Sequence, residues 1–297
     1  LGIDVGTSAC KVALFAQDGT VVAQGTGEYA VHYPQAGWAE QCPEDWWQAF
    51  LASAGEVLHS HPQARQNLLA IACSCQGEGT LPVDRDGNPL ARALLYMDMR
   101  GQAAVQRQVG GRLPRVAGYD PLKLWHWLRL TGGAPALSGK DPFGHIAFIR
   151  EAMPELYART AKFLNVLDFM NLRLTGRTVA TVDSALTTWV TDNRDPAHIR
   201  YDEGLLRLQP VECVTAGEQI QAQIVAGLPV RGDLQDRRAA DAARGDQHAV
   251  AEVRAVAAGL DVERDARKCI QPFLVLAAER QRHQARTRGQ QRMAELA

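Results

Sequence analysis

The chain opens with Leu1-Gly2-Ile3-Asp4-Val5-Gly6-Thr7-Ser8-Ala9-Cys10-Lys11, which carries the first information about the fold. The apolar run to Val5 predicts a strand that delivers Asp4 to a tight turn, and residues 11–15 alternate into a second strand. Such a hairpin presents backbone N–H groups and hydroxyls to an anion, with a carboxylate beside them for hydrated Mg²⁺. No Gly-Lys-Ser/Thr leads into a helix, so this is not a P-loop. An ordinary hairpin with a surface Asp is the alternative.

Composition excludes several classes of protein. The chain has 297 residues, 46% of them hydrophobic, and 32 Lys and Arg balance 33 Asp and Glu. Nucleic acid or an anionic membrane would call for excess positive charge, so we expect a small polar ligand and neither of those partners. No apolar run approaches the roughly 18 to 20 residues of a membrane-spanning helix, and the start carries no basic flank of a signal peptide. We expect a cytoplasmic protein with free thiols.

Aromatic residues divide the chain into two parts. All six Trp and all six Tyr lie between Tyr29 and Tyr201, and only Phe273 follows. From Gln209 onward Ala, Arg, Gln, Glu and Asp dominate, and an apolar helix face is hard to draw. We therefore expect a folded domain over 1–208 and an irregular, helical or disordered tail over 209–297. Two explanations of the tail stay open, a naturally shortened protein and a frame-shifted reading of a longer gene. The second is favoured, because GC-rich coding DNA translated out of frame tends to give Arg- and Ala-rich sequence with few aromatic residues.

The first part reads as mixed α/β. Asp18-Gly19 is a hairpin signal, and Pro43 with the acids after it opens a helix. Strands are predicted at 1–5, 11–15, 21–23, 70–74 and 81–84, and helices at 43–60, 101–109, 121–130, 144–152, 154–160 and 168–174.

Several segments, in this order, resemble the FGGY family of carbohydrate kinases, a branch of the actin-like ATPases, and most closely its xylulokinase-like members. They are Asp4-Val5-Gly6-Thr7-Ser8 with Lys11, Gly37-Trp38-Ala39-Glu40-Gln41, Pro43-Glu44-Asp45-Trp46-Trp47, Gln76-Gly77-Glu78-Gly79, Asp86-Gly87 to Pro89, Asp98-Met99-Arg100, and Phe163-Leu164 with Asp168 and Arg173-Leu174-Thr175-Gly176-Arg177. The resemblance covers roughly residues 1–208 and implies an actin-like, ribonuclease H-like domain: a mixed, five-stranded type of sheet flanked by helices.

The resemblance also implies an activity, ATP-dependent phosphorylation of a ketose or polyol. It implies that Asp4 holds Mg²⁺ or its water, and that the phosphates of ATP face Gly6, Thr7, Ser8 and Lys11. It places four further residues near the sugar, namely Gln76, Glu78, Asp98 and Arg100. Amide, carboxylate and guanidinium groups at strand ends suit a polyol, because they pair several hydroxyls at once. A solvated loop carboxylate is the alternative for Glu78, and a plain surface ion pair is the alternative for Asp98 and Arg100.

Departures from the family pattern leave the sugar open. Cys42 stands where the family usually has Asp, and Tyr96 stands where the family often has Trp. Gly77-Glu78 replaces the Met-His of typical xylulokinases. The Trp cluster at 38, 46 and 47 suits either a sugar-stacking platform or core packing, and core is favoured. Cys73 and Cys75 share one strand face but lack the second pair that a zinc site needs.

Phosphoryl transfer also needs a carboxylate that accepts the hydroxyl proton. The candidate is Asp233, in an early and incomplete echo of the family's Gly-Gly-Asp turn at 227–233, and a helix-capping or loop role is favoured for it. A non-catalytic sugar-binding remnant of a kinase is the alternative function. Another actin-like ATPase without a sugar substrate is disfavoured, because the segment 76–100 would then lack a purpose. A homodimer is left open.

Overall fold

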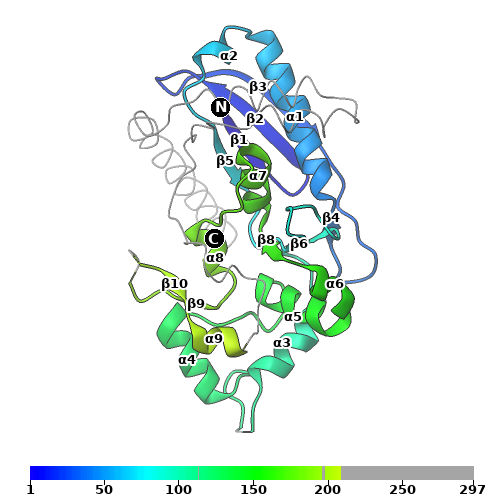
Figure 1. Ribbon diagram of the computed structural model, residues 1–297, viewed down its shortest axis with the longest axis vertical. Coiled ribbons are helices and arrows are strands. Elements are labelled where there is room, and N and C mark those ends of the chain that lie inside the picture. Colours follow the sequence, from blue (N-terminus) through cyan, green and yellow to red (C-terminus); the bar gives the residue numbers. More distant parts are fainter. Residues whose placement is uncertain (113, 196–197, 209–297) are drawn as a thin grey trace, which may run out of the picture.

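The computed structural model describes residues 1–112, 114–195 and 198–208 (Figure 1). Its main sheet has the strand order β3-β2-β1-β5. Antiparallel pairing joins β1 (Gly2–Val5), β2 (Ala9–Phe15) and β3 (Val21–Glu28), while β5 (Ala72–Cys75) lies parallel to β1. The expected mixed sheet is confirmed. Within the described ranges it has four strands, not five, because the strand predicted over 81–84 pairs elsewhere.

Side chains alternate across this sheet as the pleat requires. Ile3 and Val5 face the core and are 3% and 0% exposed, whereas Asp4 between them is exposed. Lys11 is the cross-strand partner of Asp4 on β2 and is exposed as well. The opening strand therefore turns its one charge away from the core, next to a charge of opposite sign.

Helix α1 (Pro43–Ser60) packs on β2 and β3 and supplies the largest core side chains. Trp46, Trp47 and Phe50 are fully buried, which confirms the expectation that the Trp pair is core. Two glycines of β3 permit the close approach: a Cβ on Gly25 would lie 2.9 Å from the carbonyl oxygen of Ser53. A Cβ on Gly27 would lie 3.0 Å from the Cα of Ala49.

The remaining elements lie outside the main sheet, most of them in the middle and lower part of Figure 1. They are α2 (Ala64–Asn67), β4 (Glu40–Gln41) paired with β7 (Ala93–Leu94), β6 (Leu81–Val83) paired with β8 (Lys162–Leu164), α3 (Gln102–Val109), α4 (Pro121–Thr131), α5 (Pro142–Ala152), α6 (Pro154–Arg159), α7 (Val166–Thr175), α8 (Val182–Leu186), β9 (Thr191–Asp192) paired with β10 (Arg200–Tyr201), and α9 (Glu203–Leu208). The six predicted helices are all present. Elements of two to six residues account for those that the sequence pattern missed.

A second core forms among α3, α4, α5 and α9, around the buried side chains of Trp127 and Phe143. Aspartate and proline start two of its helices: Asp120 and Asp141 accept hydrogen bonds from the first-turn N–H groups of α4 and α5. Three glycines let α3 and α5 meet, since a Cβ on Gly101 would lie 2.4 Å from the carbonyl carbon of Gly144. Such contacts leave no room for a side chain.

Asp168, in the first turn of α7, is a buried acid. Its Oδ2 accepts the Asn165 N–H at 2.9 Å, and its Oδ1 has no partner within the described ranges. Burial raises the pKa of Asp168 to about 7. The unfolded chain releases this proton near pH 4, roughly the ordinary value, so the folded state binds more protons between about pH 4 and 7.

The fold should therefore lose stability as pH rises through that window. Asp168→Asn keeps an acceptor for the Asn165 N–H but cannot ionise. We expect the free energy of unfolding of the wild type to fall by about 3–4 kcal/mol relative to Asp168→Asn between pH 4 and pH 7.5. Urea titrations at both pH values measure this difference. Asp183→Asn, at an exposed acid of α8, is the control, and equal pH dependence in all three proteins would refute the assignment.

None of the helices in the described part of the chain has the length and apolar character to cross a membrane. The described cysteines, Cys10, Cys42, Cys73 and Cys75, are free thiols, and the two on β5 approach to 3.6 Å between their sulfur atoms. The predicted tail over 209–297, with Asp233, lies outside the described residues.

Candidate functional site

Two loops leave the same edge of the main sheet. Because β1 and β5 are parallel, the turn Gly6–Ser8 and the segment 76–79 both begin at carboxyl ends of neighbouring strands, where α/β proteins collect their ligand groups. The backbone N–H of Gln76 donates to the carbonyl of Val5 at 2.8 Å, which holds the two loops together at their origin. The structure thus joins segments about 70 positions apart in the sequence.

The turn Gly6–Ser8 has its carbonyl groups tied to the protein. Tyr29 donates its hydroxyl to the carbonyl of Gly6 at 2.7 Å and its backbone N–H to that of Ser8 at 3.2 Å. The Gln41 side chain donates to the carbonyl of Thr7 at 2.6 Å. Among the described residues, no acceptor takes the backbone N–H groups of Thr7 and Ser8. The turn therefore offers donors outward, the arrangement that binds an anion.

Asp4 and Lys11 flank this turn on the exposed face of the sheet. Neither side chain has a hydrogen bond or ion pair within the described ranges. No group of three or more His, Cys, Asp and Glu side chains in those ranges could hold a metal ion. A lone carboxylate still fits Mg²⁺, which keeps several waters and is held by one or two carboxylates together with phosphate oxygens. Asp4 supplies such a carboxylate, and the N–H groups of Thr7 and Ser8 beside it suit phosphate oxygens.

Gln76 connects to the turn Gly6–Ser8 through a second glutamine. Its Nε2 donates to Oε1 of Gln41 at 2.7 Å, and Gln41 in turn donates to Thr7. The Oε1 of Gln76 is buried and has no partner in the described part of the chain. A buried acceptor without a donor costs about 1–3 kcal/mol, so this oxygen is a place for a hydroxyl hydrogen.

Glu78 has two features of a functional carboxylate. Its backbone is in the left-handed region, at φ 56, which is uncommon for a residue other than glycine and clusters at ligand sites. Its half-buried side chain makes no hydrogen bond or ion pair within the described ranges. Burial raises the pKa of the Glu78 carboxyl, and the nearby charge of Asp141 raises it further. The Glu78 side chain is therefore not the fully solvated loop carboxylate of the alternative interpretation, and it has no partner within the described ranges.

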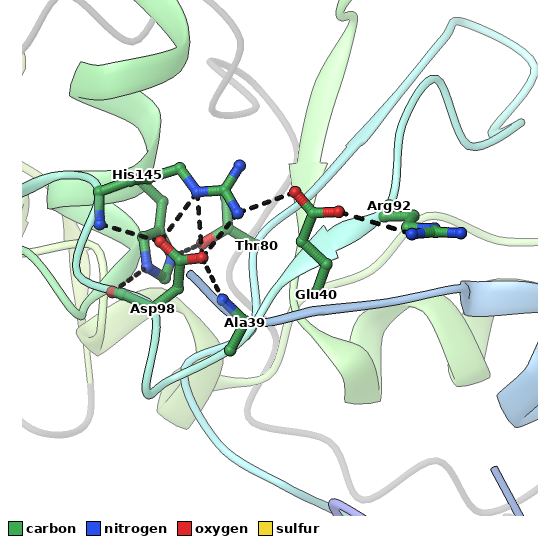
Figure 2. A network of polar contacts seen from close by, with 7 residues as sticks. Ala39, Glu40, Thr80, Arg92, Asp98 and His145 are labelled. Carbon is green, nitrogen blue, oxygen red and sulfur yellow. Dashed lines mark hydrogen bonds and ion pairs between the residues drawn. The ribbon is translucent and has the colours of Figure 1, made fainter. Parts of the chain in front are cut away.

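Asp98 and Arg100 form a buried network (Figure 2). Arg100 donates from Nε to Oδ1 of Asp98 at 2.9 Å and from Nη2 to Oδ2 at 2.7 Å, and Nη2 also reaches Glu40 at 2.8 Å. The side chains of Arg100 and Asp98 are 4% and 0% exposed. Asp98 also accepts the backbone N–H of Ala39 at 2.7 Å. The expected alternative of a surface ion pair is wrong, because the pair is enclosed.

Around that pair, the guanidinium of Arg100 lies 3.7 Å from the ring centroid of Trp38. His145, fully buried, bridges the carbonyl of Asp98 and the hydroxyl of Thr80 (Figure 2). Since a carbonyl only accepts, Nε2 carries the proton and Nδ1 accepts from Thr80. Burial lowers the pKa of His145 to about 4, which keeps the ring neutral. Asp98 and Arg100 are enclosed and bonded to each other, to Ala39 and to Glu40, a geometry that suits a structural anchor.

The structure therefore brings together some of the predicted site residues. Asp4, Gly6, Thr7, Ser8, Lys11 and Gln76 gather at the edge of β1 and β5, whereas Asp98 and Arg100 belong to the network with Glu40. Sequence reasoning missed Gln41 as a functional candidate. Its signal was present, since it lies in the segment 37–41 quoted for the family resemblance, but nothing local shows what it bonds.

A family model describes the first part of the chain. Residues 1–114 match the FGGY family of carbohydrate kinases, N-terminal domain. A glycerol kinase from Afipia carboxidovorans is 30% identical over 81% of this chain and 49% of its own length. A xylulose kinase from Bacillus subtilis is 30% identical over 59% of this chain and 33% of its own length. The chain thus spans about half the length of such relatives or less.

Solved structures show the same fold. A xylulose kinase from Rhodospirillum rubrum superposes with a TM-score of 0.60 at 20% identity, over 71% of this chain and 40% of that one. A glycerol kinase from Plasmodium falciparum with ADP superposes with a TM-score of 0.58 at 17% identity, over 72% and 43%. The expected fold class and the family resemblance are confirmed.

Proposed function

We propose that the chain acts in the transfer of the terminal phosphoryl group of ATP to a hydroxyl of a ketose or polyol. The proposal starts from the match of residues 1–114 to the FGGY family of carbohydrate kinases. One observation carries the proposal. The turn Gly6–Ser8 has all three carbonyls held by the protein and two N–H groups without an acceptor among the described residues. A turn of that polarity binds an anion.

The residues divide the work between two neighbouring loops. The N–H groups of Thr7 and Ser8, with the ammonium of Lys11, bind the phosphates, and Asp4 orients a hydrated Mg²⁺. Bound Mg²⁺ supplies positive charge against the phosphate oxygens. Gln76 and Glu78 accept hydrogen bonds from sugar hydroxyls and hold the alcohol beside the phosphates. Phosphoryl transfer is catalysed mainly by such positioning and charge, with little covalent chemistry for the protein.

The acceptor alcohol is the less constrained half of the proposal. The curated relatives are named glycerol kinase and xylulose kinase, so both a polyol and a ketose are represented among them. Glu78 stands where its half-buried, unpaired carboxylate can take a hydroxyl of either. Asp233, the sequence candidate for the base, stays a prediction, because it lies outside the described residues.

Titration of the full chain with Mg·ATP by calorimetry tests the phosphate site. Lys11→Met removes a charged donor and should weaken Mg·ATP binding about 10- to 100-fold, and Asp4→Ala should weaken the Mg²⁺-dependent part of it. Asp86→Asn, at an exposed loop acid, should leave the affinity unchanged. Wild-type affinity in the Lys11 and Asp4 variants would contradict the proposal.

An ADP-release assay over glycerol, D-xylulose and other ketoses and polyols tests the reaction. Sugar-dependent ADP release that disappears in Asp4→Ala supports the kinase. Binding of a polyol without any ADP release would support the alternative of a non-catalytic sugar-binding remnant.

A further inference from the structure

Gln41 is the most fully bonded polar side chain near the turn Gly6–Ser8, the proposed phosphate-binding turn, which we call the phosphate turn. It is 1% exposed and belongs to β4, whose strand partner is β7. Its Nε2 lies 2.6 Å from the carbonyl of Thr7 and 3.4 Å from that of Ala30. Its Oε1 lies 3.0 Å from the indole nitrogen of Trp46 and 2.7 Å from Nε2 of Gln76. The side-chain amide therefore contacts both the phosphate turn and the segment 76–79, which we call the substrate segment.

Chemistry fixes which way this amide points. An indole N–H only donates and a backbone carbonyl only accepts. The indole of Trp46 thus requires an oxygen opposite it, and the carbonyl of Thr7 requires an N–H. Both demands are met by one orientation of Gln41, with Oε1 toward Trp46 and Nε2 toward Thr7. The reverse orientation would set donor against donor and acceptor against acceptor.

The fixed polarity passes on to Gln76. Because Oε1 of Gln41 accepts, Gln76 must turn its NH₂ group toward it, and the oxygen of Gln76 is left on the other side. That oxygen has no donor within the described ranges. Two protein groups that cannot change roles, an indole and a carbonyl, therefore decide that Gln76 keeps a buried acceptor without a donor.

We propose that Gln41 is a positioning residue that couples the phosphate turn to Gln76 and makes Gln76 select a hydroxyl donor of the substrate. This rests on the proposed kinase function and deepens it. A group that only accepts, such as a carboxylate or a ketone oxygen, meets the oxygen of Gln76 unfavourably. A ligand on either loop helps to order the other, because both loops share the Gln41 amide, and such coupling is reciprocal.

The first test measures this coupling in the full chain. The affinity for pyrophosphate is measured by calorimetry without and with saturating glycerol or D-xylulose, whichever binds. In the wild type the polyol should tighten pyrophosphate binding about fivefold or more. Gln41→Met should reduce that factor to about one. Trp46→Phe removes the indole donor but leaves the contacts of Gln41 with Thr7 and Gln76, and should keep the coupling. Undiminished coupling in Gln41→Met would overturn the proposal.

A pH profile separates positioning from mere packing. Gln41→Glu is nearly the same size, but an ionised carboxylate cannot donate to the carbonyl of Thr7, whereas the protonated acid can. Pyrophosphate affinity of this variant, taken as a ratio to the wild type at each pH, should therefore recover severalfold as pH falls. A ratio that does not change with pH would count against the bond to Thr7 as the cause.

A ligand-free measurement keeps the inference distinct from the proposed function. Gln76→Ala should shift the backbone amide resonances of Thr7 and Ser8 in the otherwise wild-type chain, and should leave them in place when Gln41→Met is also present. Equal shifts in both backgrounds would refute the link through Gln41. If this link is found but neither pyrophosphate nor a polyol binds, the kinase proposal fails and the claim that Gln76 selects a substrate hydroxyl fails with it.

Discussion

Arg100→Ala should lower the free energy of unfolding by about 3–5 kcal/mol, because it leaves buried carboxylates without their counter-ion. Asp98 is 0% exposed and Glu40 only 15%, and both lie within 2.8 Å of Nη2 of Arg100. The guanidinium also fills the space over the ring of Trp38. Lysine cannot restore the paired contacts to Asp98, since an ammonium lacks the planar fork, so Arg100→Lys should recover only part of the loss.

Urea denaturation measures this loss, and Arg207→Ala is its matched control. Arg207 pairs with Glu203 one helical turn away, but their side chains are 81% and 88% exposed, so that substitution should cost less than about 0.5 kcal/mol. The comparison also bears on the predicted sugar contact. If Arg100 faced a substrate from solvent, its removal would leave stability nearly unchanged. A loss below about 1 kcal/mol in Arg100→Ala would show that its carboxylates are solvated.

Gly139→Ala should be of similar severity, at about 3–5 kcal/mol, through a backbone clash. Its backbone has φ +66, and an added Cβ would lie 2.2 Å from the backbone nitrogen of Gln102 and 2.3 Å from the carbonyl carbon of Gly101. No side chain can rotate away to relieve such contacts. The start of α3 would have to move off the loop that leads into α5.

Gly132→Ala isolates the clash from the conformational strain. Gly132 ends α4 at φ +79 and has nothing within 4 Å of its added Cβ, so its replacement should cost only the left-handed strain, about 1–2 kcal/mol. The difference between the two variants in urea denaturation is then the cost of the contact. Equal losses would mean that the loop yields and that α3 and α5 are not held at this distance.

Local signals explain what could be predicted. Patterns within a few neighbouring residues predict the opening hairpin and the six helices, of which the one at 43–60 is the longest. These patterns are alternation, proline at a first helical position and aspartate at a cap. The short elements β9, β10 and α8 carry too few residues for any period to be visible. The prediction of a fifth strand in the main sheet was wrong for another reason. A strand's partner is chosen by the fold, and β6 found β8 about 80 positions later.

The site divides in the same way. Asp4, Thr7 and Ser8 could be proposed from sequence, because a strand and the turn after it are built from consecutive residues. Gln41 could not, since its bonds reach Thr7 and Gln76, 34 and 35 positions away. Asp98 and Arg100 were seen as a pair, but their burial depends on Ala39 and Glu40, about 60 positions earlier.

The amino-acid sequence by itself determined the chemical groups of this protein and the local turns that present them, because backbone geometry and capping depend on near neighbours. Only the tertiary structure decided which of those groups face a ligand and which hold the protein together. Desolvation and hydrogen-bond direction are properties of the assembled surroundings, and they made Arg100 a buried counter-ion and Gln41 a link between two loops.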